Sequence, residues 1–409
     1  MGMKEKRTIV WLTTQFPNGK KNRNGIFIYR TVKFLSEYYD IHVLNLYSRT
    51  PPYLVMLKKL SGAAKIYKEW EVRFPSTPVK PEGSDSFNVK YVRYFRLPRG
   101  RFDYLEKHFV YSKVKRYVKK LISKKSDVII HSNWLFPESS LALMMRNELG
   151  TKYAVSLRGG DIRELTAGTK NFSEAKAVLA GAERIGVVTD EILHDAEKIG
   201  IDLKKDKIRS LNNYYDVSEF VIKDRNGAKN ELGLSPDCRV IFYAGTLRKL
   251  KNIDSLIKTL PELKTTFDKL KLFIAGSGAE EKKLKRIAEE LGLKNEVVFT
   301  GNVDGKSMVK FYNAADVFCL PSFNEGLPNV CVESLLCGTP VAASSVGGVP
   351  SVITEGLNGF MFDPYSVFDI KEKLMMVLEK NWDRNELRET VSRFMPEKIK
   401  KSYDEFYAF

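Results

Sequence analysis

The stretch that decides the fold lies at residues 239–301 and reads RVIFYAG (239–245), DSLIKTLPELK (254–264), LKLFIAG (270–276), EEKKLKRIAEELG (280–292) and VVFTG (297–301). Short apolar runs alternate here with segments whose apolar residues recur at helical spacing. This alternation is typical of βα units in a parallel sheet. We therefore predict an α/β fold in which the second half of the chain forms one doubly wound domain.

The same alternation extends to both sides of this stretch. Further strands are predicted at 316–322, 339–344 and 358–362, with helices at 307–315, 328–338 and 351–356. In the first half, strands are predicted at 7–16, 40–47, 127–134, 152–160 and 184–190, with helices at 25–38, 138–150 and 191–200. The first half therefore predicts a second doubly wound domain.

The strand pattern is interrupted near residues 214–226, which places a domain boundary there. We predict an N-terminal domain at 1–215 and a C-terminal domain at 221–389. The last segment, about 390–409, has apolar residues at helical spacing and no strand after it, so we expect a helix that packs back on the first domain. Two such domains facing each other would line an interdomain cleft.

Composition indicates a soluble globular protein, because 43% of the 409 residues are hydrophobic and 29% are charged. No apolar run approaches the roughly 18 to 20 residues that span a bilayer, and the first residues lack an apolar signal core, so we expect a cytoplasmic protein. The four cysteines form no Cys-x-x-Cys pair and the four histidines show no metal-ligand spacing. The sequence therefore indicates neither a zinc site nor a disulfide framework.

The net charge of +17 is concentrated in the first half of the chain. Residues 1–220 carry +16 and residues 221–409 carry +1, while residues 1–125 alone carry +19. A basic half indicates an anionic partner, which could be nucleic acid, a membrane surface or a phosphorylated acceptor. The alternative is a lysine-rich surface that serves only solubility.

Two segments in this basic half are amphipathic. The segment at 50–70 resembles an interfacial membrane-binding segment, with an ordinary surface helix as the alternative. The segment at 101–125 is expected to be a helix with a densely basic face opposite an apolar one. Its apolar face would carry Phe102, Leu105, Phe109, Tyr117 and Leu121.

In doubly wound sheets, ligands bind beyond the carboxyl ends of the strands. The candidate binding residues are therefore the unusual residues that follow each apolar run. These are Gly19, Gly25, Arg158 to Asp161, Asn213, Gly245 to Lys251, Gly276, Gly278, Ser322 to Glu325, Gly347 and Gly348.

The most informative of these segments is PSFNEGLPNVCVESLL at 321–336. Pro328 suits the first position of a helix, which places Glu325 before the helix and Glu333 about one and a half turns inside it. Free amides at a helix start can donate to a diphosphate, and a carboxylate can accept from pairs of sugar hydroxyls. One acid could hold a hexose and the other a ribose. The alternative is a capping acid and a solvated helical glutamate.

The segment from Ser322 to Glu333 resembles the Glu-x7-Glu motif of retaining glycosyltransferases with the GT-B fold, in the large family four. Other parts of the second half resemble segments of the same family in the same order. Tyr243 to Leu247, together with Lys251, is similar to the Gly-Arg-Leu and Lys-Gly segment of the family. Gly276 to Gly278 is similar to its Gly-x-Gly loop. Residues 315–322 and 338–341 are similar to its later segments.

The first half resembles the family more weakly. Phe16 and Pro17 with Gly25 to Phe27 are similar to the opening loop of members that build bacterial surface polysaccharides. His131 to Trp134 and Ser156 to Asp161 are similar to the family's later strand-end segments.

The resemblance implies a GT-B fold and transfer of a hexose-type sugar from a nucleotide diphosphate sugar. It implies that Glu325 contacts the transferred sugar and Glu333 the ribose, while Lys251 and Arg248 stabilise the leaving diphosphate. The implied donor-binding residues are Gly25, Arg158, Asp161, Gly245, Lys251, Gly278, Gly326, Leu327, Pro328, Asn329 and Glu333. No nucleophile is implied. Because no Asp-x-Asp occurs, we expect no metal and no other cofactor.

Several residues depart from the family pattern. Thr246 stands where a phosphate-binding Arg is frequent, so Arg248 is the candidate to replace it. Asn252 stands in place of Gly and Arg158 in place of His. Tyr214 replaces a Gly, and Ser351 replaces a Glu.

The expected partners are a UDP- or GDP-sugar, a glycan or lipid-linked acceptor of surface polysaccharide synthesis, and the anionic inner face of the cytoplasmic membrane. A catalytically silent nucleotide-sugar binder and a sugar-nucleotide epimerase are the alternatives. Nucleic-acid binding is not expected, because the basic half lacks an interleaved aromatic and basic motif.

Overall fold

The computed structural model describes residues 6–17, 25–48, 80–81, 83–94 and 103–409, which form two compact units. The first unit is Met1–Tyr214 with Glu397–Phe409, and the second is Tyr215–Pro396. The amphipathic segment predicted at 50–70 and the candidate residue Gly19 lie outside the described residues.

The first unit is built on a parallel sheet of seven strands in the order β3-β2-β1-β4-β5-β6-β7. The strands are β1 (Thr8–Thr13), β2 (Asp40–Ser48), β3 (Asn88–Tyr94), β4 (Val128–Asn133), β5 (Lys152–Leu157), β6 (Arg184–Val187) and β7 (Ile208–Ser210). Strand β1 pairs with β2 on one side and β4 on the other, from Thr8 opposite both Asp40 and Val128. The strand order therefore reverses between β1 and β4.

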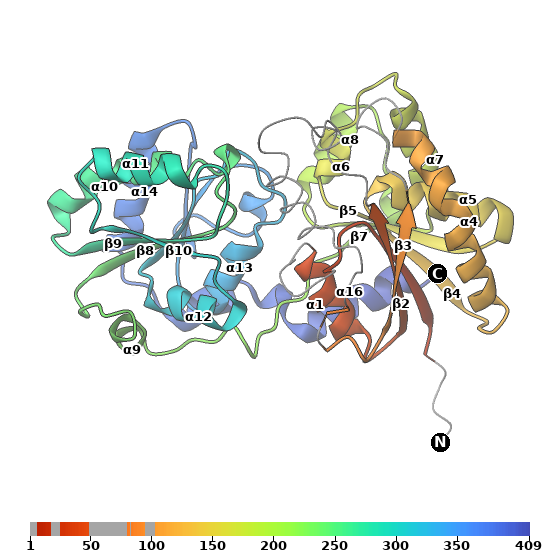
Figure 1. Cartoon of the computed structure of the whole chain (residues 1–409), viewed down its shortest axis with the longest axis horizontal. Coiled ribbons are helices and arrows are strands. Elements are labelled where there is room, and N and C mark those ends of the chain that lie inside the picture. Colours follow the sequence, from red (N-terminus) through yellow and green to blue (C-terminus); the bar gives the residue numbers. More distant parts are fainter. Residues whose placement is uncertain (1–5, 18–24, 49–79, 82, 95–102) are drawn as a thin grey trace, which may run out of the picture. The chain divides into compact units, whose positions relative to one another are not determined.

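Helices cover both faces of this sheet (Figure 1). They are α1 (Ile26–Leu35), α4 (Asp103–Ile122), α5 (Ser140–Leu149), α6 (Gly160–Arg163), α7 (Lys170–Gly181), α8 (Glu191–Lys198) and α16 (Pro396–Tyr407), with short turns η1 (Leu135–Ser139) and η2 (Lys205–Lys207). Helices α4, α5 and α7 pack together on one face, and α1 and α16 lie on the other. Helix α7 was not predicted from the sequence, and its start is capped by Thr169, whose side chain accepts from the Phe172 amide.

The second unit has a parallel sheet of six strands in the order β10-β9-β8-β11-β12-β13. They are β8 (Arg239–Ala244), β9 (Leu270–Ala275), β10 (Val297–Gly301), β11 (Val317–Leu320), β12 (Val341–Ser344) and β13 (Gly359–Phe362). The order reverses between β8 and β11. Both sheets confirm the predicted α/β class with two doubly wound sheets.

The helices of the second unit also lie on both faces of its sheet (Figure 1). They are α9 (Arg225–Asn230), α10 (Ile253–Thr266), α11 (Glu281–Glu290), α12 (Gly305–Ala314), α13 (Asn329–Leu336), α14 (Val367–Glu379) and α15 (Arg384–Glu389), with turns η3 (Lys249–Lys251), η4 (Val349–Ser351) and η5 (Ser392–Phe394). The helix predicted at 351–356 was wrong. That segment is a turn, in which Asn358 Oδ1 accepts from the Thr354 amide and replaces helical hydrogen bonding.

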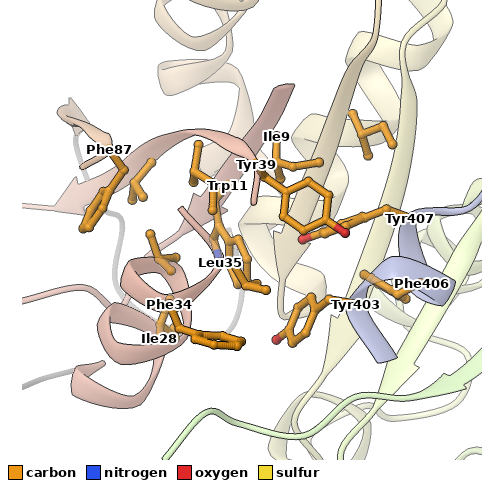
Figure 2. Close-up of a cluster of buried hydrophobic side chains, with 14 of the residues drawn as sticks. Ile9, Trp11, Ile28, Phe34, Leu35, Tyr39, Phe87, Tyr403, Phe406 and Tyr407 are labelled. Carbon is orange, nitrogen blue, oxygen red and sulfur yellow. The ribbon is translucent and has the colours of Figure 1, made fainter. Parts of the chain in front are cut away.

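The C-terminal helix α16 is part of the core of the first unit. Tyr403, Phe406 and Tyr407 are fully buried and pack in one cluster with Trp11 of β1 and Tyr39 (Figure 2). Each large side chain buried in this way contributes roughly 1.5 to 3 kcal/mol to folding. The first unit therefore depends on the last residues of the chain for its hydrophobic core.

Helix α4 packs on its sheet through Val110, Val114 and Val118, which are buried at helical spacing. The fully buried stripe thus differs from the predicted apolar face, because Tyr117 and Leu121 are only half-buried. Phe102 and the side chains of Leu105 and Phe109 lie outside the described part. Within the described residues, no helix combines the length and hydropathy needed to cross a bilayer.

Candidate active site

The candidate site of the second unit lies at the carboxyl ends of β8 and β11, where the strand order reverses. The loop after β8 carries Gly245 to Lys251, and the loop after β11 carries Ser322 to Pro328. Doubly wound sheets generally bind ligands at such a point, where chain segments leave the sheet in opposite directions.

Lys251 and Glu325 meet across this point as an ion pair. The distance from Lys251 Nζ to Glu325 Oε1 is 2.6 Å, and the two side chains are 21% and 13% exposed. The two loops are also joined by the Phe323 amide, which donates to the Leu250 carbonyl at 2.9 Å. The pair is therefore formed by the loops themselves, and both charges remain accessible to a ligand.

Asn252 fixes the position of Lys251. Its backbone has φ +52° and ψ +32°, the left-handed region that glycine adopts freely and that asparagine tolerates best among other residues. The side chain is buried, donating to the Pro364 carbonyl at 2.8 Å and accepting from Ser255 Oγ at 2.8 Å. This conformation explains how Asn252 can occupy a position at which the family that the sequence resembles usually has glycine.

The start of α13 presents free amides beside this ion pair. Pro328 is the N-cap residue and Asn329 the first helical residue, so the predicted position of Pro328 is one residue too far into the helix. The amides of Gly326, Leu327 and Val330 make no hydrogen bond within the described part of the chain. Asn329 Oδ1 accepts from Tyr215 OH at 2.6 Å. Unpaired amides at a helix start favour an anion.

Glu333 lies in the second turn of α13. Its Oε2 accepts a hydrogen bond of 3.0 Å from the hydroxyl of Tyr312, which belongs to α12 and is fully buried. Burial and the neighbouring Glu333 carboxylate both raise the pKa of Tyr312, so its hydroxyl stays protonated as a donor. Tyr312 orients Glu333 and was not identified from the sequence, because nothing marks it among the other aromatic core residues.

The glycine-rich turns after β8 and β9 pack backbone against backbone. A Cβ on Gly278 would lie 2.2 Å from the Leu247 carbonyl oxygen, so only glycine fits there. The amide of Glu280 donates to that same oxygen at 3.0 Å. Gly245 lies at the end of β8, and its amide donates to the Ala275 carbonyl at 2.9 Å.

Arg248 is exposed and extended at the start of η3. Its side chain has no hydrogen-bond or ion-pair partner among the described residues. It is therefore a cation close to Lys251 in the chain that is available to a ligand.

The remaining candidates, Gly25, Arg158 and Asp161, lie in the first unit. Arg158 donates to Asn213 Oδ1 at 2.6 Å and to Asn133 Oδ1 at 3.2 Å. Asp161 Oδ1 accepts from the amides of Arg158 and Gly159 at 3.2 and 3.0 Å. Asp161 thus shapes the turn after β5, and Arg158 bridges the ends of β4 and β7.

Two acids of the first unit have unusual pKa values. Burial raises the pKa of Asp161 to about 6 and that of Glu138 to about 8. Glu138 was missed by the sequence reasoning. The available signal was its place at the start of the predicted helix at 138–150, shortly after the predicted strand at 127–134.

Two further observations delimit the site. No group of three or more His, Cys, Asp or Glu side chains that could hold a metal occurs among the described residues.

A hollow of about 590 Å³ lies at the amino ends of the strands of the first sheet, lined by residues such as Lys6, Arg7 and Lys400. Arg7 is paired with Asp127 and Lys400 with Asp404, so this hollow is less suited to an anion than the free amides of α13.

Comparison with known proteins finds a family model that matches most of the second unit. Residues 224–394 match the sequence model of the family described as Glycosyl transferases group 1. The D-inositol 3-phosphate glycosyltransferase of Mycolicibacterium smegmatis is 30% identical over 189 residues, covering 46% of this chain and 42% of the relative. The N-acetyl-alpha-D-glucosaminyl L-malate synthase of Bacillus anthracis is 23% identical over 286 residues, covering 68% and 74%. The chain spans about half the length of the first curated relatives it matches.

Solved structures resemble the whole chain. The structure of HepE from Anabaena in complex with UDP has a TM-score of 0.70 and 15% identity, covering 98% of both chains. HepE was also solved with UDP-glucose, with a TM-score of 0.68. At this identity the likeness shows the fold.

Proposed function

We propose, from the match of residues 224–394 to the group 1 glycosyl transferases and from the similarity to the relatives above, that this chain transfers a hexose-type sugar from a nucleotide diphosphate sugar with retention of configuration. The observation that carries the proposal is the meeting of Lys251, Glu325 and the free amides of α13 where the strand order of the second sheet reverses. A cation, an acid and an anion-binding helix start are the groups that such a donor requires.

The chemical task of the second unit is to stabilise the leaving group. As the anomeric bond breaks, negative charge develops on the nucleoside diphosphate. Lys251, Arg248 and the amides of Gly326 and Leu327 would stabilise it, since fixed charges and dipoles aimed at developing charge lower a barrier most effectively. Because cations and amides can serve this role, and because the sequence has no Asp-x-Asp, we propose that no metal is required.

The two acids have different roles in this proposal. Glu333, oriented by Tyr312, would accept from the ribose hydroxyls, while Glu325 would accept from the hydroxyls of the transferred sugar. No protein nucleophile is assigned. HepE binds UDP and UDP-glucose, which supports a nucleotide sugar as donor.

The acceptor in this proposal is a glycan or lipid-linked glycan of surface polysaccharide synthesis, reached at an anionic membrane surface. The support lies in α4, whose exposed side carries Lys113, Arg116, Lys119 and Lys120. No described carboxylate lies within ion-pair distance of these four side chains. Each such cation near an anionic surface contributes about 1 kcal/mol, so four can recruit the protein reversibly.

The first experiment is a thermal-shift panel with UDP, GDP, ADP and their glucose, galactose, mannose and N-acetylglucosamine conjugates. One nucleotide series is expected to raise the melting temperature, because ligands that bind only the folded state stabilise it. Failure of every nucleotide to do so would contradict the donor site. Lys251→Ala is expected to abolish the shift, whereas Lys258→Ala, an exposed lysine of the following helix, should leave it intact.

A catalytically silent nucleotide-sugar binder is the second candidate. It is favoured by Arg158, which replaces a histidine of the resembling family and is already bonded to Asn133 and Asn213. Slow hydrolysis of the preferred nucleotide sugar to nucleoside diphosphate supports the transferase. Binding without hydrolysis supports the silent binder, and conversion to another sugar supports an epimerase.

A further inference from the structure

Glu138 is a fully buried acid that has no role in the proposed reaction. It lies in the turn η1 between β4 and α5, with 0% of its surface exposed. Its Oε1 accepts a hydrogen bond of 2.7 Å from the backbone amide of Thr14. Its Oε2 has no partner among the described residues. The side chain therefore connects the turn after β4 to the first residue after β1.

Thr14 begins the β1–α1 loop, which ends at Gly25. These two ends are in contact, because a Cβ on Gly25 would lie 2.2 Å from the Gln15 carbonyl oxygen, and Gly25 has φ +74°. The described ends of the loop are thus in contact, and only glycine can take the position of Gly25. Fixing Thr14 therefore also holds Gln15 in its contact with Gly25.

The far end of the loop is held from the same side. The ring of Phe27, in the first turn of α1, contacts Trp134 edge to face at a centroid distance of 6.5 Å. The Arg158 guanidinium lies 5.4 Å from the centre of the same ring. The turns after β4 and β5 thus hold both ends of the β1–α1 loop, at the point where the strand order of the first sheet reverses.

The surroundings of Glu138 favour its protonated form. Burial, with a smaller contribution from the Asp161 carboxylate, raises its pKa to about 8, although the hydrogen bond from Thr14 acts to lower it. The other charged or titratable groups on elements packed against η1 include Arg158 after β5, His131 of β4, and the Lys107 and Glu174 ion pair between α4 and α7. No hydrogen bond or ion pair joins any of them to Glu138.

We propose that Glu138, carrying its proton, is the positioning residue for Thr14 and Gln15 at the start of the β1–α1 loop, and that loss of this proton weakens their attachment to η1. A neutral acid can accept from Thr14 without a counter-ion. An ionised one would leave a buried charge whose second oxygen has no donor, and such a charge is strongly unfavourable. Ionisation would therefore draw in water or displace the side chain, and the attachment of Thr14 would weaken. This step does not depend on which reaction the protein catalyses.

The direct test follows the Thr14 amide by ¹H-¹⁵N TROSY spectra of deuterated full-length protein from pH 6.5 to 9.5. The Thr14 resonance is expected to shift with a midpoint near 8 in the wild type and to stay constant in Glu138→Gln, which keeps the acceptor oxygen but cannot ionise. Glu148→Gln, at an exposed acid of the same unit, should titrate as the wild type. A Thr14 resonance that does not titrate, or that titrates equally in Glu138→Gln, overturns the proposal.

A second readout rests on the proposed function. In the pH profile of donor hydrolysis, with the nucleotide sugar selected by the thermal-shift panel, wild-type activity is expected to fall above pH 8. Glu138→Gln should keep the wild-type rate at pH 7.5 within about twofold and lose the alkaline decline, whereas Glu138→Ala should lose at least about tenfold at every pH. Equal alkaline declines in the wild type and Glu138→Gln contradict the inference. Absence of hydrolysis in the wild type counts against the proposed function alone, since the Thr14 spectra still decide the inference.

Discussion

The ammonium of Lys251 lies 2.6 Å from Oε1 of Glu325, so the cation assigned to the diphosphate is bonded to the acid assigned to the sugar. The two groups cannot act independently, because a carboxylate held by a cation competes with any phosphate for that cation. A donor that binds here must replace part of the ion pair. Because both side chains remain partly exposed, this exchange requires no unfolding of either loop.

This ion pair predicts opposite effects for its two members. Lys251→Ala should weaken binding of the preferred nucleoside diphosphate by roughly 10- to 150-fold, since a hydrogen bond to a charged group contributes about 1.5 to 3 kcal/mol. Glu325→Ala should leave this affinity unchanged or increase it, because Lys251 is released, while sugar transfer falls. Calorimetry with the diphosphate measures both, and Glu262→Ala, at an exposed acid paired with Lys371, is the control. Equal loss of diphosphate affinity in the two variants would show that the acids are wrongly assigned.

Glu333 and Tyr312 form the second pair with a measurable consequence. Glu333→Ala should weaken binding of the nucleoside diphosphate by roughly 10-fold or more, because it removes the acceptor assigned to the ribose. Tyr312→Phe should weaken this binding less, because the Glu333 carboxylate remains and loses only the hydrogen bond of 3.0 Å from the Tyr312 hydroxyl. Ribose and 2′-deoxyribose forms of the diphosphate distinguish the role: Glu333→Ala should remove most of the wild-type preference for ribose. A preference that survives in this variant would place the ribose elsewhere.

The residues of the candidate donor site could be predicted from the sequence, because apolar runs indicate buried strands and ligands bind just beyond the carboxyl ends of those strands. It placed Gly245, Lys251, Glu325 and Glu333 in one unit of the fold, and the reversal of strand order shows why the first three belong together. It could not reveal the contact of Lys251 with Glu325, since a pairing across 74 positions depends on loop conformation. Nor could it explain Asn252, whose positive φ is a property of the backbone.

The catalytic proposal predicts insensitivity to metal removal. Donor hydrolysis or transfer should persist within about twofold in excess EDTA, because Lys251, Arg248 and the amides before α13 are assigned the role of a divalent cation. The measurement compares rates with EDTA, with magnesium and with manganese. Complete loss in EDTA that is restored by either metal would contradict the assignment.

His131 predicts an acid-sensitive first unit. It is fully buried, with Nδ1 2.6 Å from Tyr407 OH and Nε2 2.6 Å from Ser156 Oγ, and burial with the Arg158 charge lowers its pKa well below 6.5. The unfolded state therefore binds more protons than the folded state below pH 6.5, so this contribution to stability is present above that pH and lost as the pH falls. Urea unfolding from pH 7.5 to 5 should show a smaller loss of stability in His131→Gln than in the wild type. His194→Gln, at an exposed histidine, should retain the wild-type slope; equal slopes in all three proteins would contradict the prediction.

The basic side of α4 predicts reversible membrane binding. Lys113, Arg116, Lys119 and Lys120 are free of carboxylate partners among the described residues, so their charge is available to anionic lipid. Vesicles of phosphatidylglycerol and phosphatidylcholine should bind the protein more tightly as the fraction of anionic lipid rises. Binding should weaken as salt is added, because the Debye screening length falls from about 30 Å at 0.01 M to about 10 Å at 0.1 M. Changing all four residues to Gln should weaken binding at least about tenfold, given about 1 kcal/mol for each charge in contact.

The matched control for this membrane test is the same change at Lys282, Lys283, Lys285 and Arg286 of α11 in the second unit. Three of those side chains are already paired with Glu280, Glu281 and Glu290, so their loss should have little effect on vesicle binding. Equal weakening by the two sets would mean that overall charge, and not α4, drives the association. Binding that is independent of anionic lipid, or absent at low salt, would remove the membrane from the proposed function while leaving the donor site of the second unit untouched.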